Sequence, residues 1–235
     1  MKTQFYVALI MTAAVAISGA ACTQPAANGN SAMNHNGMNH NGMMMNSNSP
    51  MNHNGMNHNG AGNSAMMDHS EMKSSPNAAS QPYDLQFLDT MVHHHQGAVD
   101  MAKMVLTKSQ NEELKKFAQK IIDDQNREIA QMKDWRGKWY ASNPPAMNME
   151  MAGMADSMKM MMGDGMKKLE ASSGKGFDLM FVDMMTPHHV GAVVMAKEAL
   201  TKAEHPEIKT LANQIIKSQE AEVKQMADWK TNWSK

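Results

Sequence analysis

The chain contains little cysteine, few aromatic residues and almost no net charge. Cys22 is the only cysteine among 235 residues, aromatic residues make up 5%, and the formal net charge is -1. The charge disfavours electrostatic capture of nucleic acid. The scarcity of cysteine disfavours a structural zinc site, which would need cysteines or more histidines. Gly-x-Ser-x-Gly, phosphate-loop, Gly-x-Gly-x-x-Gly and Cys-x-x-Cys motifs are also absent, which disfavours hydrolase, nucleotide-binding and thiol-redox chemistry.

Methionine, in contrast, is abundant, with 30 residues in the chain. Thiols oxidise or cross-link in an oxidising compartment, whereas thioethers continue to donate to soft cations there. A chain rich in methionine and poor in cysteine is therefore suited to handling metal outside the cytosol.

Residues 1–21 are typical of a signal peptide. Lys2 is followed by an apolar run over residues 5–17 and by small residues up to Ala21, and the run is too short for a stable membrane span. We therefore expect a periplasmic or extracellular protein. The sequence Gly-Ala-Ala-Cys22 resembles a lipoprotein cleavage site, so two outcomes stay open. Either Cys22 is lipidated and anchors the protein to a membrane, or cleavage near Ala21 leaves a free cysteine.

Residues 22–82 are predicted to form a disordered arm, because they are rich in Asn, Gly, Ser, Met and His and poor in branched and aromatic residues. The unit Met-Asn-His-Asn-Gly occurs four times in this arm, so a thioether precedes each of its histidines by two positions. These histidines are His35, His40, His53 and His58. The arm is either a low-specificity collector of metal ions or a solvated spacer that grew by repeat expansion.

Residues 83–140 and 177–235 are predicted to be two copies of one helical hairpin. Asp84 to Trp139 aligns without gaps with Asp178 to Trp233, and 28 of the 56 paired positions are identical. Each copy has apolar residues at helical spacing on both sides of a short polar turn, which predicts two antiparallel helices. Two such hairpins predict an all-α, antiparallel four-helix bundle. Residues 141–176 are predicted to be a methionine-rich linker with one short helix, whose thioethers either capture soft metal or cover apolar surface.

Each hairpin carries a His-His pair and methionines on one face of its first helix. Met91 lies three and four positions before His94 and His95, so it can share an ion with either. Met101 lies about 10 Å from His94 along the helix axis and is better placed for a second ion or a partner helix. The candidate metal ligands are Met91, His94, His95, Met101, Met185, His188, His189 and Met195, with His93, Met104, Met132 and Met226 as additional candidates. The alternative interpretation is that all of them are ordinary core residues.

The second helix of each hairpin offers polar groups to these histidines. An antiparallel hairpin places Gln125 and Glu128 across from His94 and Met91. Such a carboxylate or amide can accept the second imidazole N–H and orient the ring, or it can make a routine interhelical hydrogen bond. The second copy has Gln219 and Glu222 at the same positions. Gly97 and Gly191, which follow the His-His pairs, allow a neighbouring helix to approach closely.

The softness of the donors indicates which metal is expected. Mixed thioether and imidazole donors favour Cu(I) and, by extension, Ag(I), whereas Cu(II) prefers the imidazoles. A di-iron centre would need carboxylates and Glu-x-x-His pairs, and neither hairpin contains such a pair. Copper is therefore the expected ion.

The motif of His94-His95 with Met101, and of His188-His189 with Met195, resembles a family of small secreted bacterial proteins marked by a His-His pair followed by methionine. The CopM-type periplasmic copper-binding proteins belong to it. The resemblance covers residues 83–140 and 177–233 and includes the Gly-Ala after each pair and the C-terminal tryptophans. It implies a ferritin-like four-helix bundle and copper binding that protects the cell envelope.

Residues and resemblance together predict an exported, non-enzymatic protein that sequesters or transfers Cu(I), with Ag(I) or Cu(II) as further ions, in copper homeostasis and resistance. Its candidate partners are a copper efflux system or a cuproprotein. Two alternatives of different class are a copper-dependent envelope oxidoreductase that uses the same ligands, and a structural or interaction lipoprotein whose methionines only pack.

Overall fold

The computed structural model describes residues 72–233. These residues form a short 3-10 turn η1 (Ala78–Ser80) and six helices, which are α1 (Tyr83–Lys108), α2 (Glu112–Trp139), α3 (Met154–Met158), α4 (Gly165–Ala171), α5 (Gly174–Lys202) and α6 (Pro206–Trp233). No strand occurs within the described range. The predicted signal peptide, Cys22 and the four histidines of the Met-Asn-His-Asn-Gly units lie outside it.

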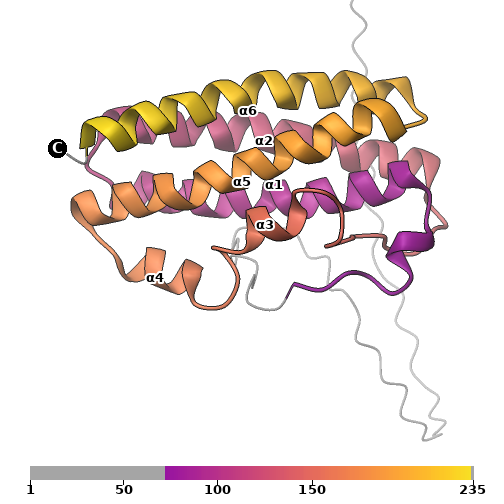
Figure 1. Ribbon diagram of the computed structural model, residues 1–235, viewed down its shortest axis with the longest axis horizontal. Helices are drawn as coiled ribbons and strands as arrows, with labels where there is room; N and C mark the ends of the chain where they lie inside the picture. The colour runs from indigo at the N-terminus through magenta and orange to yellow at the C-terminus, as the bar shows by residue number, and fades with distance from the viewer. Residues whose placement is uncertain (1–71, 234–235) are drawn as a thin grey trace, which may run out of the picture. The chain divides into compact units, whose positions relative to one another are not determined.

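The four long helices form two hairpins that pack against each other (Figure 1). α1 pairs with α2, and α5 pairs with α6. At the start of α1, the Asp84 carboxylate accepts hydrogen bonds from the backbone N–H groups of Glu204 and His205, just beyond α5, at 2.9 Å each. At the other end, Lys108 Nζ lies 5.9 Å from the ring centroid of Phe177. α1 and α5 are therefore antiparallel, which confirms the predicted all-α four-helix bundle.

Local sequence signals set the ends of these helices. The Asn111 side chain caps α2 by accepting hydrogen bonds from the N–H groups of Glu113 at 3.0 Å and Leu114 at 3.1 Å. Pro206 is the first residue of α6, where a missing N–H costs least. The short connection between α1 and α2 follows from these signals and forces the two helices to run side by side.

The linker of residues 141–176 packs onto the bundle. α2 and α5 run in the same direction, so the chain must cross the length of the bundle between them, as in ferritin-like folds with one long crossover. The backbone N–H of Ala146 donates to Asp89 Oδ2, and that of Asn148 donates to Thr90 Oγ1, each at 2.8 Å. The linker contains two short helices, α3 and α4, where the sequence predicted one. α3 packs against α5 and α1.

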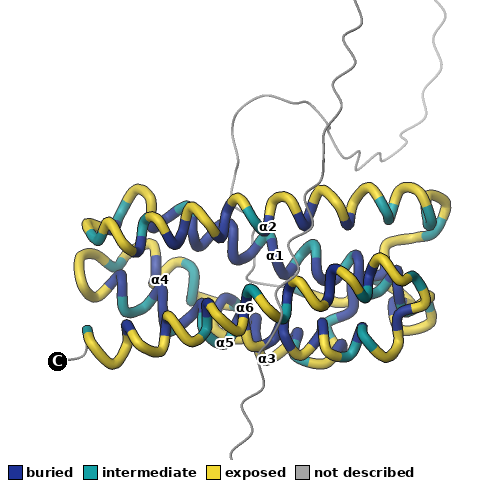
Figure 2. The backbone as a smooth tube through the Cα atoms, turned by 90° about the horizontal axis from the view of Figure 1, so that it is seen from above, coloured by how far each residue is buried: buried dark blue, intermediate teal, exposed yellow. Residues whose placement is uncertain are grey.

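The core between the helices is built largely from methionine and small or branched apolar side chains. Figure 2 shows buried and exposed residues alternating around each long helix. Phe117 of α2 meets Trp229 of α6 edge to face, with ring centroids 4.9 Å apart, and this contact joins the second helices of the two hairpins. Methionine adapts to irregular gaps, so a core of this composition can close around an asymmetric linker.

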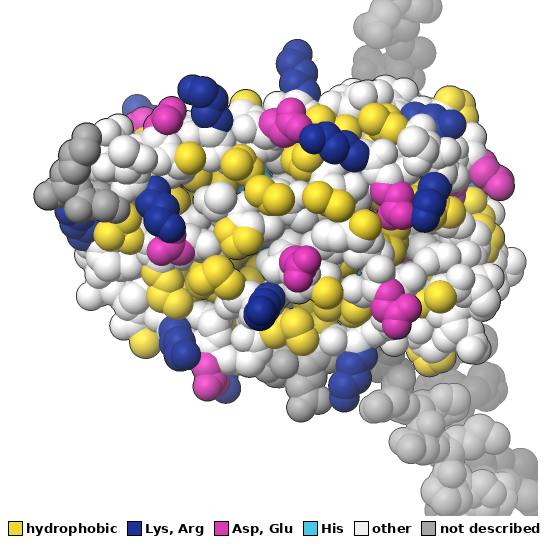
Figure 3. Space-filling view, viewed as in Figure 1, with side chains coloured by type: hydrophobic (Ala, Val, Ile, Leu, Met, Phe, Trp, Pro, Cys, Tyr) yellow, Lys and Arg dark blue, Asp and Glu magenta, His cyan; other side chains and the backbone are white. Residues whose placement is uncertain are grey.

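The face of the bundle that carries α3 and α5 has both positively and negatively charged side chains (Figure 3). Figure 3 shows basic and acidic side chains interspersed there among hydrophobic ones. Val190 and Val194 of α5 are the exposed branched residues on that helix, at 46% and 39%. The mixed charges agree with the net charge of the chain, and on this face they form no continuous basic surface that would bind a polyanion (Figure 3).

Candidate metal centre

The two His-His pairs meet in the middle of the bundle, where α1 faces α5. The ring centroids of His94 and His188 lie 3.8 Å apart, with 34° between the ring planes. All four side chains, including those of His95 and His189, are 0% exposed. Because α1 and α5 are antiparallel and these equivalent residues touch, an approximate twofold axis relates the hairpins and passes between His94 and His188. We call these two the inner histidines, and His95 and His189 the outer histidines.

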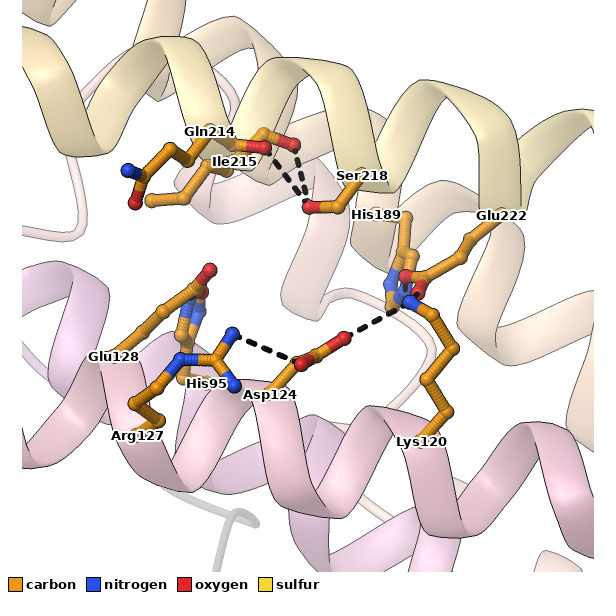
Figure 4. Close-up of polar contacts among 10 residues, drawn as sticks. All are labelled: His95, Lys120, Asp124, Arg127, Glu128, His189, Gln214, Ile215, Ser218 and Glu222. Atoms are coloured by element: carbon orange, nitrogen blue, oxygen red, sulfur yellow. Dashed lines mark hydrogen bonds and ion pairs between the residues drawn. The ribbon is translucent and has the colours of Figure 1, made fainter. Parts of the chain in front are cut away.

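Each outer histidine is held by a carboxylate from the second helix of its own hairpin. His95 Nε2 lies 2.7 Å from Glu128 Oε2, and His189 Nε2 lies 2.9 Å from Glu222 Oε2 (Figure 4). Counting across the turn placed Glu128 opposite Met91, which lies four residues, or about one helical turn, before its partner His95. Such a carboxylate orients an imidazole and fixes which nitrogen carries the proton.

The predicted glutamines are buried beside these carboxylates without taking the same role. Gln125 and Gln219 are 3% and 2% exposed. Within residues 72–233, neither Oε1 atom has a hydrogen-bond partner. The carboxylates, and not the amides, therefore orient the outer rings.

One inner histidine has a hydrogen bond to the linker. His94 Nε2 lies 3.0 Å from Ser157 Oγ, and the Ser157 hydroxyl donates to the carbonyl of Met154 at 2.8 Å. A hydroxyl has one proton to donate, so the His94 Nε2–H must be the donor to Ser157 Oγ. This bond leaves Nδ1 of His94 as the nitrogen with a lone pair.

The Nδ1 atoms of three histidines are buried acceptors. In the described part of the chain, Nδ1 of His94, His95 and His189 has no hydrogen-bond partner. Burying a polar atom without a partner costs free energy, and each such atom in a folded protein calls for an explanation such as a bound ion. These three nitrogens fit the lone pairs that a metal ion requires.

Buried thioether groups lie on the same four helices as the histidines and their carboxylate partners. Of the seven predicted methionines on the long helices, Met104 is 4% exposed and the other six are 0% exposed. These six are Met91, Met101, Met132, Met185, Met195 and Met226. Thr186 Oγ1 lies 3.9 Å from Met226 Sδ, which is a weak hydrogen bond to sulfur. His93 lies apart from this group, because it lines a surface pocket together with Val92 and Met147. The structure thus separates His93 from the other predicted ligands.

The linker brings two residues to the centre that the sequence did not single out, Ser157 and Met161. A Cβ atom at Gly97 would lie 2.7 Å from Met161 Cε, 3.3 Å from Met161 Sδ and 3.4 Å from His188 Nε2. A Cβ atom at the equivalent Gly191 would lie 2.2 Å from Ser157 Cβ. Both glycines therefore allow the linker to lie against the inner histidines. The sequence features that could have indicated these two residues were the glycine repeated at positions 97 and 191 and the methionine run in the linker.

Burial and neighbouring charges keep the inner histidine His94 in its neutral form. Burial, followed by the charges of His95 and His189, holds the pKa of His94 well below its ordinary value of 6.5. Neutral imidazole is the form that binds metal ions. His94 is thus prepared to act as a ligand at neutral pH.

The carboxylate of Glu222 is stabilised in its charged form. Burial raises its pKa, but the hydrogen bond and charge of His189 and the ion pair with Lys120 outweigh burial and leave the pKa lowered. The Lys120 Nζ–Glu222 Oε1 distance is 2.7 Å, and this bond crosses from α2 to α6. The position equivalent to Lys120 in the second hairpin is Gln214 (Figure 4), so the two carboxylates have different surroundings.

The donors at the centre are imidazole nitrogen and thioether sulfur. Among residues 72–233, no three His, Cys, Asp or Glu side chains gather closely enough to hold a metal ion. Imidazole nitrogen and thioether sulfur suit soft cations and not Mg²⁺ or Ca²⁺, which take oxygen ligands.

Comparisons with known proteins find one matching family model and several similar solved structures. The family model described as "Domain of unknown function (DUF305)" matches residues 17–136 and 84–230. The solved structure "CopM in the Cu(II)-bound form" is 41% identical, with a TM-score of 0.54, over 64% of this chain and 97% of that chain.

Two further solved structures are similar. "CopM in the Cu(I)-bound form" is 40% identical, with a TM-score of 0.53, over 64% of this chain and 96% of that chain. A putative secreted DUF305 protein from Streptomyces coelicolor is 32% identical, with a TM-score of 0.55, over 65% of this chain and 93% of that chain. No curated protein matches the chain.

Proposed function

The chain belongs to the DUF305 family, and from this membership and the centre described above we propose that it is an exported protein that binds Cu(I) between its two hairpins. It sequesters or transfers copper in the cell envelope and so contributes to copper homeostasis and resistance. The observation that carries the proposal is the buried contact between His94 and His188, whose ring centroids are 3.8 Å apart in a bundle with many buried methionines. The similar CopM structures are of Cu(I)-, Cu(II)- and Ag-bound forms.

The proposed ligands come from both hairpins. They are Met91, His94, His95 and Met101 of α1 with Met185, His188, His189 and Met195 of α5, and the additional candidates are Met104 of α1, Met132 of α2 and Met226 of α6. A metal–imidazole bond measures about 2 Å, so two imidazoles on one ion need their nitrogens within about 4 Å. The close approach of the His94 and His188 rings supports a shared ion, and the buried Nδ1 atoms supply lone pairs for it.

The donor set supports Cu(I) and Ag(I) as the preferred ions and Cu(II) as a weaker alternative, because thioethers are soft donors and Cu(II) would use the imidazoles alone. Glu128 and Glu222 orient the outer rings and do not themselves ligate the ion. Copper is the cargo in this proposal, it stays exchangeable, and no catalytic step is assigned.

The proposal extends to parts of the chain before residue 72. Residues 1–21 direct export, and Cys22 attaches the protein to a membrane if it is lipidated. The histidines of the arm, His35, His40, His53 and His58, collect ions and pass them to the bundle. A copper efflux system or a cuproprotein then receives them. His93 acts, at most, as a ligand at the surface.

A competition experiment tests the central site. The full chain and a variant with His94, His95, His188 and His189 all replaced by glutamine are titrated with Cu(I) against a chelator, and circular dichroism checks that both are folded. We expect the variant to hold at least one fewer tightly bound ion. The matched control is His205→Gln, because His205 packs on Trp139 at one end of the bundle, with ring centroids 3.8 Å apart. Equal copper retention by the wild type and the fourfold variant would refute the site.

A further inference from the structure

The helix α3 and the turn after it cover the place where the two hairpins meet. α3 packs against both α5 and α1 (Figure 1). Its residue Ser157 approaches Gly191 of α5, and Met161, four positions later, approaches Gly97 of α1. Gly97 and Gly191 are equivalent positions of the two repeats. One segment outside the repeats therefore touches both halves of the pseudo-twofold centre.

The two contacts of this segment differ in chemistry. On one side the Ser157 hydroxyl takes the Nε2–H of His94 at 3.0 Å. On the other side, Met161 Sδ and His188 Nε2 lie 3.3 Å and 3.4 Å from one point, the Cβ position of Gly97. His94 Nε2 and His188 Nε2 are equivalent atoms of the repeat. The linker thus places a hydroxyl oxygen on one inner histidine and a thioether sulfur in the space that the other inner histidine borders.

Met161 is held in the space that Gly97 leaves open, which His188 Nε2 also borders. Its side chain is 0% exposed, and the missing side chain of Gly97 is what lets its thioether reach this depth. Met161 also follows α3 closely, with its backbone N–H bonded to the carbonyl of Met158 at 2.9 Å. The sulfur cannot occupy this space unless α3 lies over the bundle, so the position of the sulfur and the seating of α3 are coupled.

We propose that Met161 is a thioether ligand that shares a soft cation with His188, so that the linker completes the metal site and the bound ion fastens α3 to the bundle. The proposal rests on the proposed function, because it requires Cu(I) or Ag(I) at the inner histidines. The alternative is that Met161 only fills a gap in the core, as methionine often does. The two differ in what removal of the sulfur does to metal binding.

The test replaces sulfur without changing volume. Met161→Leu and the control Met158→Leu are volume-conserving changes, both at positions that are 0% exposed and both in the segment that covers the centre. The full chain is titrated with Cu(I) against a competing chelator. Whatever the residues before 72 bind is common to all variants. We expect Met161→Leu to weaken retention of one ion at least about tenfold, the lower end of the loss seen when an outer partner of a metal ligand is removed, and Met158→Leu to leave it unchanged.

A direct readout follows the methyl groups of the methionines. In protein labelled with ¹³C at the methionine methyl, the signal that disappears in Met161→Leu is the Met161 signal. On addition of Ag(I) to the wild type, we expect that signal to shift, and amide hydrogen exchange over residues 153–162 to slow. In Met161→Leu the slowing should be lost. An unshifted Met161 signal with bound Ag(I) would overturn the assignment.

A second variant moves the sulfur without removing it. In Gly97→Ala the new Cβ would lie 2.7 Å from Met161 Cε, the flexible end of that side chain, and alanine is the better helix former. We expect a folded protein with weakened Cu(I) retention, as in Met161→Leu. If Met161→Leu and Met158→Leu retain copper equally while the fourfold histidine variant still loses its ion, the role of Met161 is overturned and the proposed function stands. If the histidine variant also retains all its copper, the proposed function fails and this inference falls with it.

Discussion

Replacing Glu222 by glutamine removes the charge that orients His189 while keeping the shape of the side chain. Glu222 Oε2 lies 2.9 Å from His189 Nε2, and the residue is 7% exposed. An amide oxygen can still accept the imidazole N–H, but without the negative charge that strengthens the bond and the basicity of the ligand. Loss of such an outer partner typically lowers metal affinity 10- to 100-fold. We expect a loss of about tenfold, or about 1.4 kcal/mol.

The matched control is Glu220→Gln, which makes the same change of charge two residues away. Glu220 is exposed and pairs with Lys197 at 2.7 Å on the surface, where ion pairs contribute little. Both variants and the wild type are titrated with Cu(I) against a chelator at one pH and ionic strength. Glu220→Gln should match the wild type. If Glu222→Gln also matches it, or if both variants lose affinity equally, the orienting role of Glu222 is wrong.

The same variant makes a prediction about stability and pH. The pKa of Glu222 lies below its ordinary value of 4.5 in the folded protein, so its contribution to stability is complete above that value and is lost as the pH falls through the folded pKa. The gap in unfolding free energy between the wild type and Glu222→Gln should therefore narrow from pH 7 to pH 4 in urea denaturation. A difference in unfolding free energy that widens toward pH 4 would contradict this prediction.

Three further predictions concern the protein without copper, and one concerns copper addition. Gly191→Ala should lower the free energy of unfolding by about 1–3 kcal/mol in urea denaturation, because the new Cβ would lie 2.4 Å from the backbone oxygen of Gly153 and 2.2 Å from Ser157 Cβ. An unchanged denaturation midpoint would contradict the close packing of α3. Below pH 6.5, the free energy of unfolding should fall by up to about 1.4 kcal/mol for each pH unit, because His94 takes up a proton in the unfolded chain but not when it is buried. In urea denaturation from pH 7 to pH 5, His94→Gln should make this fall with pH smaller. Asn111→Ala removes the cap of α2 and should cost about 1 kcal/mol, whereas Asn111→Gly should cost only a few tenths. Cu(I) at about 100 times its dissociation constant should stabilise the fold by about 2.7 kcal/mol, visible as a raised Tm that a chelator reverses.

The fold was predictable because the sequence repeats itself at helical spacing. The gapless match of the two halves indicated one supersecondary unit used twice, and the short turn ending at Asn111 specified an antiparallel hairpin. Equivalent residues on the facing helices, His94 and His188, then had to lie near a common axis. These conclusions need only periodicity and connectivity, which a sequence contains.

The partners within the centre were predictable only to within about one helical turn. Counting across the turn placed Glu128 opposite Met91, whereas its partner is His95. Four residues along a helix are about one turn and a rise of about 6 Å, so Met91 and His95 share a face and the displacement of one helix along the other decides the partner. That displacement follows from how all the core side chains pack together, and a count along the chain does not contain it.

The linker was the part that sequence reasoning could not position. It has no second copy to align with and no regular apolar period, so its methionines looked alike. Which of them reaches the histidines depends on where α3 lies, and Gly97 and Gly191 determine that by leaving space for Met161 and Ser157. The glycines were visible in the sequence, but the groups that fill their space come from a distant segment.

Anomalous diffraction at the copper edge, from crystals of the full chain loaded with Cu(I), tests the central claim most directly. The prediction is a copper peak beside the His94 and His188 rings, within bonding distance of imidazole nitrogen and thioether sulfur. Copper peaks found only at the surface, with the two rings still packed against each other as at 3.8 Å, would contradict it.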